Sequence, residues 1–335
     1  MTDKVLLDYG SGGRASQRLI RDIFLKHLGN PELERLDDAA CIRDLRGPVS
    51  MSTDTFTIDP LFFPGGDIGS LAVHGTVNDV AMLGAVPRYL SCAFLLEEGL
   101  DMLDLERIVS SMSFAARECG VRIVTGDTKV VPRGAADKVF INTTGLGEII
   151  SYPPPSGDLA RPGDAILVSG AVGNHGLAIL AHRQGISFET RVESDSQGLH
   201  KVAADLIQEV GDIHVLRDPT RGGLATTLNE ISGQSGCEML ILEDNIPVHQ
   251  EVRGGCSFLG LDPLYLANEG KFICILPQEK AGKALEIMHA HKASQEAVLI
   301  GYVREGKQGR VVLETSLGGH RLLDMLEGEQ LPRIC

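Results

Sequence analysis

The segment that most constrains the fold is Ser151-Tyr-Pro-Pro-Pro-Ser-Gly157, close to the middle of the chain. Its three consecutive prolines lack backbone N–H donors, so the segment can sustain neither a helix nor a central strand. A chain of 335 residues is long enough for about two domains, each with its own core. We therefore predict a first domain at residues 1–152, a second at 158–326, and a mobile tail at 327–335.

Helix-like and strand-like patterns alternate on both sides of this boundary. The first half predicts helices at 15–28, 68–83 and 103–119, and strands at 121–125 and 138–149. The second half predicts a strand at 165–169 followed by a helix to about 184, helices near 198–210, 222–233 and 278–291, and strands at 238–243, 271–276, 297–303 and 309–315. The run from 271 to 303 resembles a βαβ unit. The predicted fold class is two α/β (or α+β) domains.

The charge balance argues against a nucleic-acid partner. The chain carries 31 basic and 45 acidic residues, a net charge of −14, whereas nucleic-acid binding favours a basic surface. No stretch approaches the ~18 apolar residues that a membrane span needs, and the start Met1-Thr-Asp-Lys4 lacks the features of a secretory signal. The seven cysteines form no C-x-x-C pair, which indicates reduced thiols. We expect a cytoplasmic protein with no membrane partner.

A glycine-rich loop, Gly10-Ser-Gly12-Gly13-Arg14-Ala15, precedes the first predicted helix. It fits the G-x-G-x-x-A pattern of dinucleotide-binding folds, and Asp37 and Asp38 follow about 25 residues later. Asp8 and Tyr9, however, interrupt the strand that should come before such a loop. A loop that binds phosphates through backbone N–H groups is the more general interpretation.

Four acidic positions in the first half follow periodic segments and stand beside small residues. They are Asp37 with Asp38, Asp54, Asp79 and Asp127. Any one of them alone is typical of a helix cap or a turn. Carboxylates gathered together repel one another unless cations bridge them, and Mg²⁺ held between carboxylates and substrate phosphates does so. With a glycine loop nearby, the series favours a site for Mg²⁺ and a nucleotide.

The second half offers two further candidate segments. Arg217-Asp218-Pro-Thr-Arg221-Gly-Gly223 precedes a predicted helix and is either an anion site at its N-terminus or a plain helix cap. Ala267-Asn268-Glu269-Gly270-Lys271 precedes a predicted strand, so Glu269 is either a base or a surface charge. The residues alone leave both pairs of alternatives open.

The last residue of the chain is a cysteine, Cys335. Nine tail residues at ~3.3 Å each reach about 30 Å, enough to cross a domain or enter a neighbouring cleft. A lipid anchor is not expected, because prenylation requires the cysteine four places from the end. The alternative is a chance cysteine on a frayed terminus.

These motifs occur together in one superfamily. The elements Asp37-Asp-Ala39, Thr53-Asp-Thr55, Val77-Asn-Asp-Val-Ala-Met-Leu-Gly-Ala85, Thr125-Gly-Asp-Thr128, Asp218-Pro-Thr-Arg-Gly-Gly223 and Asn268-Glu-Gly270 resemble those of aminoimidazole ribonucleotide synthetase, selenophosphate synthetase and thiamine-monophosphate kinase. Within this superfamily, Tyr9-Gly-Ser-Gly-Gly-Arg14 and the terminal Pro332-Arg-Ile-Cys335 resemble the HypE family, the carbamoyl dehydratases of NiFe-hydrogenase maturation. A selenophosphate synthetase would place cysteine or selenocysteine where this chain has Ser11.

The resemblance implies a role for each motif. Cys335 would receive a carbamoyl group, and ATP-dependent dehydration would turn it into a thiocyanate that supplies cyanide to iron. Glu269 would be the base, and Lys129 would orient the carbamoyl oxygen or the phosphate. Metal ligands for Mg-ATP would be Asp38, Asp54, Asp79 and Asp127, with Gly10, Gly12, Gly13, Asp37, Asn78, Gly126 and Thr128 supporting the nucleotide.

The resemblance also implies an architecture and partners. The fold would be PurM-like, with first domains pairing in a homodimer into a β-sheet or barrel that spans both subunits. The carbamoyl donor would be the transferase HypF, and the acceptor the HypC–HypD complex. Two alternatives remain: another ATP-dependent amide-activating enzyme or kinase of the superfamily, and a carrier that presents a modified cysteine without chemistry of its own.

Overall fold

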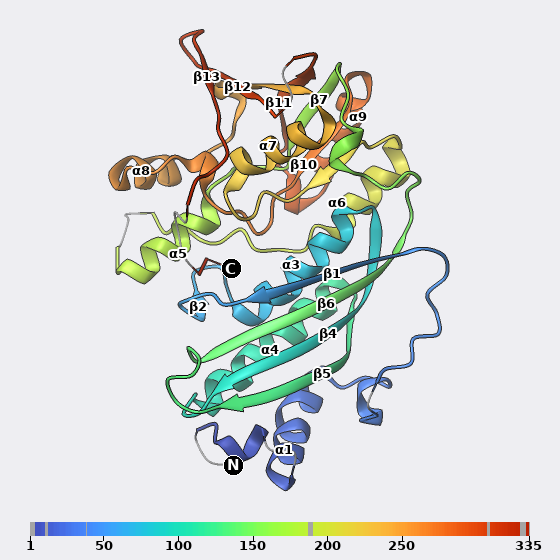
Figure 1. Cartoon of the computed structure of the whole chain (residues 1–335), viewed down its shortest axis with the longest axis vertical. Helices are drawn as coiled ribbons and strands as arrows, with labels where there is room; N and C mark the ends of the chain where they lie inside the picture. Colours follow the sequence, from blue (N-terminus) through green and yellow to red (C-terminus); the bar gives the residue numbers. More distant parts are fainter. Residues whose placement is uncertain are drawn as a thin grey trace.

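The computed structural model describes residues 4–10, 13–37, 39–186, 190–306, 309–328 and 333–334. Figure 1 shows two domains, each built on a sheet, with the last described residues, 333–334, lying between them. Three residues of the predicted site, Gly12, Asp38 and Cys335, lie outside the described residues.

The first domain is a four-stranded sheet with helices on one face. The strand order is β1 (Val49–Phe56), β6 (Val139–Ile149), β4 (Ala85–Glu97) and β5 (Arg122–Val131), with β4 and β5 parallel and the other neighbours antiparallel. Helices α3 (Ile68–Met82) and α4 (Met102–Cys119) pack on one face, while side chains such as Thr53, Thr55 and Asp127 are exposed on the other. The short strands β2 (Phe62–Phe63) and β3 (Gly66–Asp67) lead into α3.

A helical run from α1 (Arg14–Leu19) through a π-helical turn η2 (Ile20–Leu25) to α2 (Lys26–Leu28) confirms the helix predicted at 15–28. Its apolar face packs beside α4 and β4, where the rings of Phe24 and Phe94 lie 4.9 Å apart. The predicted helices at 68–83 and 103–119 are confirmed as α3 and α4.

All but three of the 15 residues of helix α3 are buried. The carboxylate of Asp67 caps its first turn by accepting the N–H of Gly69 at 2.7 Å, and the Ser70 hydroxyl completes a capping box. Glycines bring the helix close to its neighbours, because a Cβ on Gly69 would lie 2.3 Å from the carbonyl oxygen of Ile108, and one on Gly75 would lie 2.9 Å from the ring of Phe56.

The second domain is a seven-stranded sheet with helices on both faces. Its order is β13 (His320–Leu322), β12 (Val311–Glu314), β9 (Glu238–Leu242), β11 (Val298–Arg304), β7 (Asp164–Val168), β10 (Ile273–Pro277) and β8 (Val215–Arg217). The helices are α5 (Asn174–Gln184), α6 (His200–Asp205), α7 (Gly223–Ser235), α8 (Gln250–Leu259) and α9 (Ala281–Ala290). The predicted βαβ unit exists in split form, because β10 and β11 both pair antiparallel with β7, which lies between them.

The two domains share helix α3. Ala81 and Met82 at its end belong to the apolar cluster of the second domain. The side-chain amide of Asn78, which is 1% exposed, donates to the carbonyl oxygens of Gln197 (3.0 Å) and Glu269 (3.3 Å) and accepts the N–H of Leu199 at 2.8 Å. The orientation of the domains is therefore set by buried contacts.

The largest element that sequence patterns missed is β4, a strand of 13 residues in the centre of the first sheet. Gly84 and Pro87 indicated only a helix end. Pro87 is tolerated inside a central strand because the register shifts between Pro87 and Tyr89, which makes a bulge. Strand β1 and helix α8 were also missed.

Within the described ranges, no helix is both long enough and apolar enough to cross a membrane.

Replacing Gly69 with alanine tests the close contact between α3 and α4. The added methyl group would meet the backbone of Ile108, which cannot move aside easily. We expect a loss of about 1–3 kcal/mol of stability, measured by thermal and urea unfolding. The matched control is Gly254→Ala in α8, where no described heavy atom lies within 4 Å of the added methyl group; this change should stabilise by up to ~1 kcal/mol. Equal effects of the two substitutions would contradict the packing described.

Candidate active site between the domains

Acidic side chains converge where helix α3 meets the second domain. Asp79 comes from the last turn of α3, Asp54 from β1, Asp218 from the residue after β8, and Glu269 from the loop before β10. A cavity of about 580 Å³ opens at this junction. Asp79, Asp218, Arg217 and Arg221 are among the residues that line it. The structure thus brings together carboxylates from both halves of the chain.

Glu269 is the most deeply buried of these carboxylates, with 3% of its surface exposed. Its Oε1 atom has no hydrogen-bond partner among the described residues, and its backbone N–H donates to Asp195 Oδ1 at 3.1 Å. Burial, followed by the negative charges of four neighbours, holds its pKa well above 4.5; the neighbours are Asp218, Asp195, Asp54 and Asp79. A carboxylate with a raised pKa and a free oxygen is suited to accept a proton.

The pKa values of the three neighbouring aspartates, Asp218, Asp79 and Asp54, are also raised. Burial first, and then the charge of Asp79, raise the pKa of Asp218 to about 7. Burial also raises the pKa of Asp79, although the Ser52 hydroxyl, which donates to Asp79 Oδ2 at 2.7 Å, partly offsets it. Burial likewise raises the pKa of Asp54. The positive charge of Arg221 offsets only part of these shifts.

This donor set suits Mg²⁺ carried in with phosphates. Among the described residues, no group of three or more His, Cys, Asp or Glu side chains is arranged to hold a metal ion by itself. Mg²⁺ usually takes one or two protein carboxylates together with substrate phosphates and water, so a preformed cage is unnecessary. Crowded carboxylates such as Asp79 and Asp54 have the chemistry that such an ion requires.

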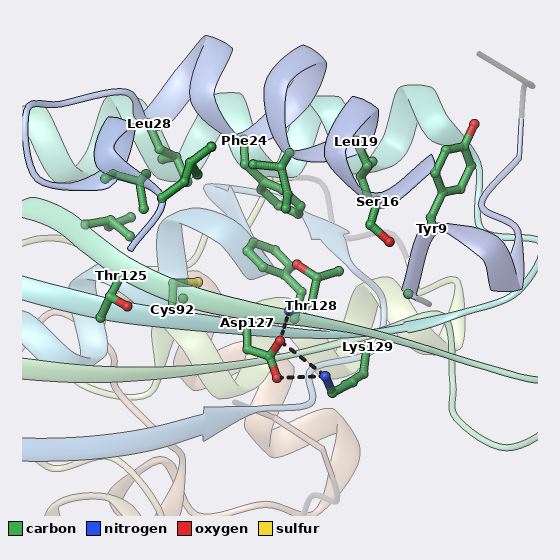
Figure 2. A pocket seen from close by; sticks show the side chains of 17 residues that line it. Tyr9, Ser16, Leu19, Phe24, Leu28, Cys92, Thr125, Asp127, Thr128 and Lys129 are labelled. Atoms are coloured by element: carbon green, nitrogen blue, oxygen red, sulfur yellow. Dashed lines mark hydrogen bonds and ion pairs between the residues drawn. The ribbon is translucent and has the colours of Figure 1, made fainter. Parts of the chain in front are cut away.

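A second cavity, of about 370 Å³, lies between the helical run at residues 14–28 and strands β4 and β5 (Figure 2). Five predicted site residues line it: Gly10, Gly126, Asp127, Thr128 and Lys129. Most of the remaining wall is apolar, formed by Leu19, Ile20, Phe24, Leu28, Phe94 and Ile123 among others. Lys129 Nζ lies 3.3 Å from Asp127 Oδ2, and both side chains are largely exposed.

The two cavities lie at opposite edges of the first sheet. Asp54 on β1 is in line with Thr143 on β6, Cys92 on β4 and Gly126 on β5. Three steps between strands at ~4.8 Å each separate β1 from β5 by about 14 Å. A single chain therefore does not bring Asp127 and Lys129 together with Asp54, Asp79 and Glu269.

Gly10, Gly13 and Asp37, three residues predicted to support the nucleotide, lie outside the carboxylate cluster. Gly10 packs on β5, because a Cβ there would lie 2.5 Å from the backbone nitrogen of Val130. Gly13 immediately precedes α1, and the described atoms leave open space where its Cβ would stand. Asp37 accepts from Arg35 Nε at 2.9 Å on the surface. Their part in nucleotide binding, like that of the buried Asn78, stays a prediction.

Comparison with known proteins identifies the family. Residues 36–149 match the family model of the AIR synthase related protein N-terminal domain, and residues 161–314 match that of the C-terminal domain. A carbamoyl dehydratase HypE from Azotobacter vinelandii is 55% identical over 98% of this chain and 96% of its own length. The chain belongs to the HypE family.

Two solved structures extend this likeness to three dimensions. A HypE crystallised in complex with ATP superimposes with a TM-score of 0.96 at 66% identity, covering 98% of this chain and 99% of the other. A HypE from a HypE–HypF complex superimposes with a TM-score of 0.81 at 44% identity, covering 92% and 99%. The PurM-like two-domain fold expected from the resemblance is therefore shown.

Sequence reasoning missed the part that two acidic residues, Asp218 and Asp195, play at this site. Asp218 was noted only as an anion-site or cap residue, yet its charge is among those that raise the pKa of Glu269. Asp195, whose Oδ2 atom is buried without a partner in the described part of the chain, lies in a stretch without helical or strand periodicity. No motif pointed to it, because its position depends on the packing of two domains.

Replacing Glu269 with glutamine tests its electrostatic environment. The pKa of Glu269 is higher in the folded protein than in the unfolded chain, so its protonated form favours folding at low pH, and this contribution is lost as the pH rises through the folded pKa. In EDTA, Glu269→Gln should therefore raise the melting temperature by at least ~2 °C near pH 8 and change it little near pH 4.5.

The matched control is Glu286→Gln on the exposed face of α9, which should leave the melting temperature nearly unchanged at both pH values. Destabilisation by Glu269→Gln near pH 8 would contradict a charge-strained Glu269.

Proposed function

We propose that this chain dehydrates a carbamoyl group carried on Cys335 to a thiocyanate, with ATP consumed, and so supplies cyanide for the iron of a NiFe-hydrogenase. One observation carries the proposal. Glu269, whose buried Oε1 atom has no partner among the described residues, donates its backbone N–H to Asp195, and the adjacent Ser194 binds His175, which holds Ile334 at the described end of the tail. Residues 194 and 195 thus link the loop that carries the base to the residue that holds the tail.

The chemistry needs two proton removals and one phosphoryl transfer. The thiocarbamate S–C(=O)–NH₂ on the cysteine is a poor substrate for water loss because its oxygen is a poor leaving group. Transfer of the γ-phosphoryl group of ATP to that oxygen, with loss of one N–H proton, gives S–C(=NH)–OPO₃²⁻ and ADP. Loss of the phosphate and of the second N–H proton then leaves S–C≡N.

Glu269 is the proposed acceptor of a nitrogen-bound proton. Its pKa is raised, so its conjugate acid forms readily, and its free Oε1 atom can take the proton without breaking a hydrogen bond. Lys129 is proposed to orient the carbamoyl oxygen or the transferring phosphate. Bound Mg²⁺ would neutralise phosphate charge, held by Asp54, Asp79 and Asp127 and by Asp38, which lies outside the described residues.

The cavity beside the helical run is the proposed place for the adenosine part of ATP. Its apolar wall, which includes Leu19 and Phe24, suits a planar base, and its polar rim of Gly10, Gly126 and Thr128 suits the sugar and phosphates. The ATP complex of a 66% identical HypE supports nucleotide binding by this fold.

A homodimer would unite the two halves of the site. Strand β5, which carries Asp127 and Lys129, lies about 14 Å from strand β1, which carries Asp54, within one chain. The sheet face that carries Thr53, Thr55 and Asp127 is exposed, so the first domain of a second copy can cover it. In a two-fold dimer, β5 of one subunit can then face the cleft of the other.

Mixing two inactive variants tests the shared site. Co-expressed Asp79→Asn and Lys129→Ala subunits should recover about a quarter of wild-type dehydration, because half of the random dimers hold one intact composite site. Co-expressed Asp79→Asn and Asp54→Asn subunits are the matched control and should recover none, since both changes damage the same half. No recovery in the first mixture, measured on the whole dimer population, would place the whole site within one chain.

The proposed partners follow from the position of the thiol. A transferase such as HypF would load Cys335 with the carbamoyl group, as supported by the crystallised HypE–HypF complex. A HypC–HypD complex would receive the cyanide. Both must reach a residue that also enters the cleft, which requires the tail to move.

The mass of the C-terminal peptide reports directly on the proposed modification of Cys335. After incubation with HypF, carbamoyl phosphate and ATP, the wild-type C-terminal peptide should first gain one carbamoyl group and then lose one water. Cys335→Ala should show neither change, whereas Cys41→Ala, which removes an exposed cysteine elsewhere, should show both. Modification of the Cys335→Ala variant, or loading without water loss in the wild type, would contradict the proposal.

A further inference from the structure

The last described residues, Arg333 and Ile334, are held in the gap between the domains (Figure 1). The side chain of Ile334 is 6% exposed and belongs to the apolar core of the first domain. The main chain is bound from the other side, by helix α5 of the second domain. The tail therefore has a specific binding site for Arg333 and Ile334, the two residues that precede Cys335.

His175, near the start of α5, binds the carbonyl oxygen of Ile334. The distance from its Nε2 atom is 2.7 Å, and because a carbonyl oxygen only accepts, Nε2 carries the proton. Its Nδ1 atom accepts from the Ser194 hydroxyl at 2.7 Å, which keeps the ring in this tautomer. The ring is fully buried and stands edge-on to Phe63 at 5.8 Å between centroids.

Arg183, on the last turn of α5, binds the carbonyl oxygen of the preceding tail residue. Its Nη2 atom donates to Arg333 O at 2.6 Å, and its Nε atom donates to Asp59 O of the first domain at 2.7 Å. The side chain of Arg333 is held in turn by the carbonyl oxygen of Thr57, at 2.8 Å, and by the carboxylate of Asp137. Arg183 thus ties the tail to both domains.

The contacts that hold the tail include charge-assisted hydrogen bonds, and a strained backbone opposes them. Hydrogen bonds from a charged guanidinium are roughly twice as strong as neutral ones. Arg333 is also held at φ = 52°, a left-handed conformation that costs a non-glycine residue about 1–3 kcal/mol. Because both donors bind main-chain oxygens, His175 and Arg183 recognise the position of the tail backbone.

We propose that His175 and Arg183 are positioning residues that form a latch, holding Arg333 and Ile334 between the domains during dehydration and opening to let the end of the tail reach a partner. The proposal rests on the dehydration proposed above. The latch and the base are tied to one segment, because Ser194 supports His175 while the adjacent Asp195 accepts the N–H of Glu269. Removing a donor of the latch therefore frees the tail while leaving the contact between Asp195 and Glu269 in place.

The test uses two variants that remove one donor each. Arg183→Met keeps the length of the side chain, and His175→Leu fills the buried space. His175→Gln retains an N–H donor near the Nε2 position and should partly restore function. The matched control is Arg191→Met, which removes an exposed arginine of the same domain whose ion partner is Glu193.

Three readouts separate a latch from a merely structural role. The first is the rate of tryptic cleavage after Arg333 in the unmodified protein, which needs no activity. The second is the rate of loading of Cys335 by HypF with carbamoyl phosphate. The third is the single-turnover rate of water loss after ATP is added to loaded protein.

We expect the donor variants to speed cleavage after Arg333 about tenfold, to load at the wild-type rate or faster, and to lose water 10- to 100-fold more slowly. Arg191→Met should match the wild type in all three. Unchanged water loss in both donor variants, or equal slowing of loading and water loss, would overturn the latch. If the wild type itself fails to lose water, the proposed function fails, and the cleavage rates still decide whether a latch exists.

Discussion

The contact on which the rest of the structure depends is the burial of helix α3 between the first sheet and the second domain. Gly69 and Gly75 let the helix approach α4 and β1, and Gly145 on β6 lets it approach the sheet, because a Cβ there would lie 2.9 Å from Thr76 and Val80. Asn78 then binds the backbone of the second domain. A helix held on all sides has no freedom to rotate, so the next residue, Asp79, faces the cleft.

The electrostatics of the site follow from that packing. Once α3 is packed in place, the charges of Asp79, Asp54 and Asp218 act on the buried Glu269, and the pKa of each of the four carboxyl groups rises. The resulting repulsion destabilises the empty protein at neutral pH and favours the binding of cations with phosphates. The same arrangement that suits Mg-ATP therefore keeps a carboxylate ready to accept a proton.

Local patterns predicted much of the fold. Helical spacing identified residues 15–28, 68–83 and 103–119, and the proline-rich segment at 151–157 separates the two sheets. Strand β4 was missed because Gly84 and Pro87 look like a helix end, whereas a bulge absorbs the proline within the strand. A tertiary pairing of this kind leaves no local signal.

The residues of the candidate site also fall into two groups: those that a local motif predicted and those whose position depends on tertiary packing. Glu269, Asp54 and Asp79 lie in motifs that short-range reasoning and family resemblance both pointed to, and the structure gathers them. Asp127 and Lys129 belong to an equally clear motif but lie at the far edge of the sheet. His175, Arg183 and Asp195 had no motif, because their roles arise only where the tail and two domains meet.

The most direct measurement is the pH dependence of single-turnover water loss from carbamoyl-loaded protein. With Glu269 as the base, the wild-type rate should rise with pH through an inflection well above 4.5, because only the deprotonated carboxylate accepts the proton. Glu269→Gln should be at least 100-fold slower and should lack this inflection. Wild-type rates and an unchanged profile in that variant would contradict the account.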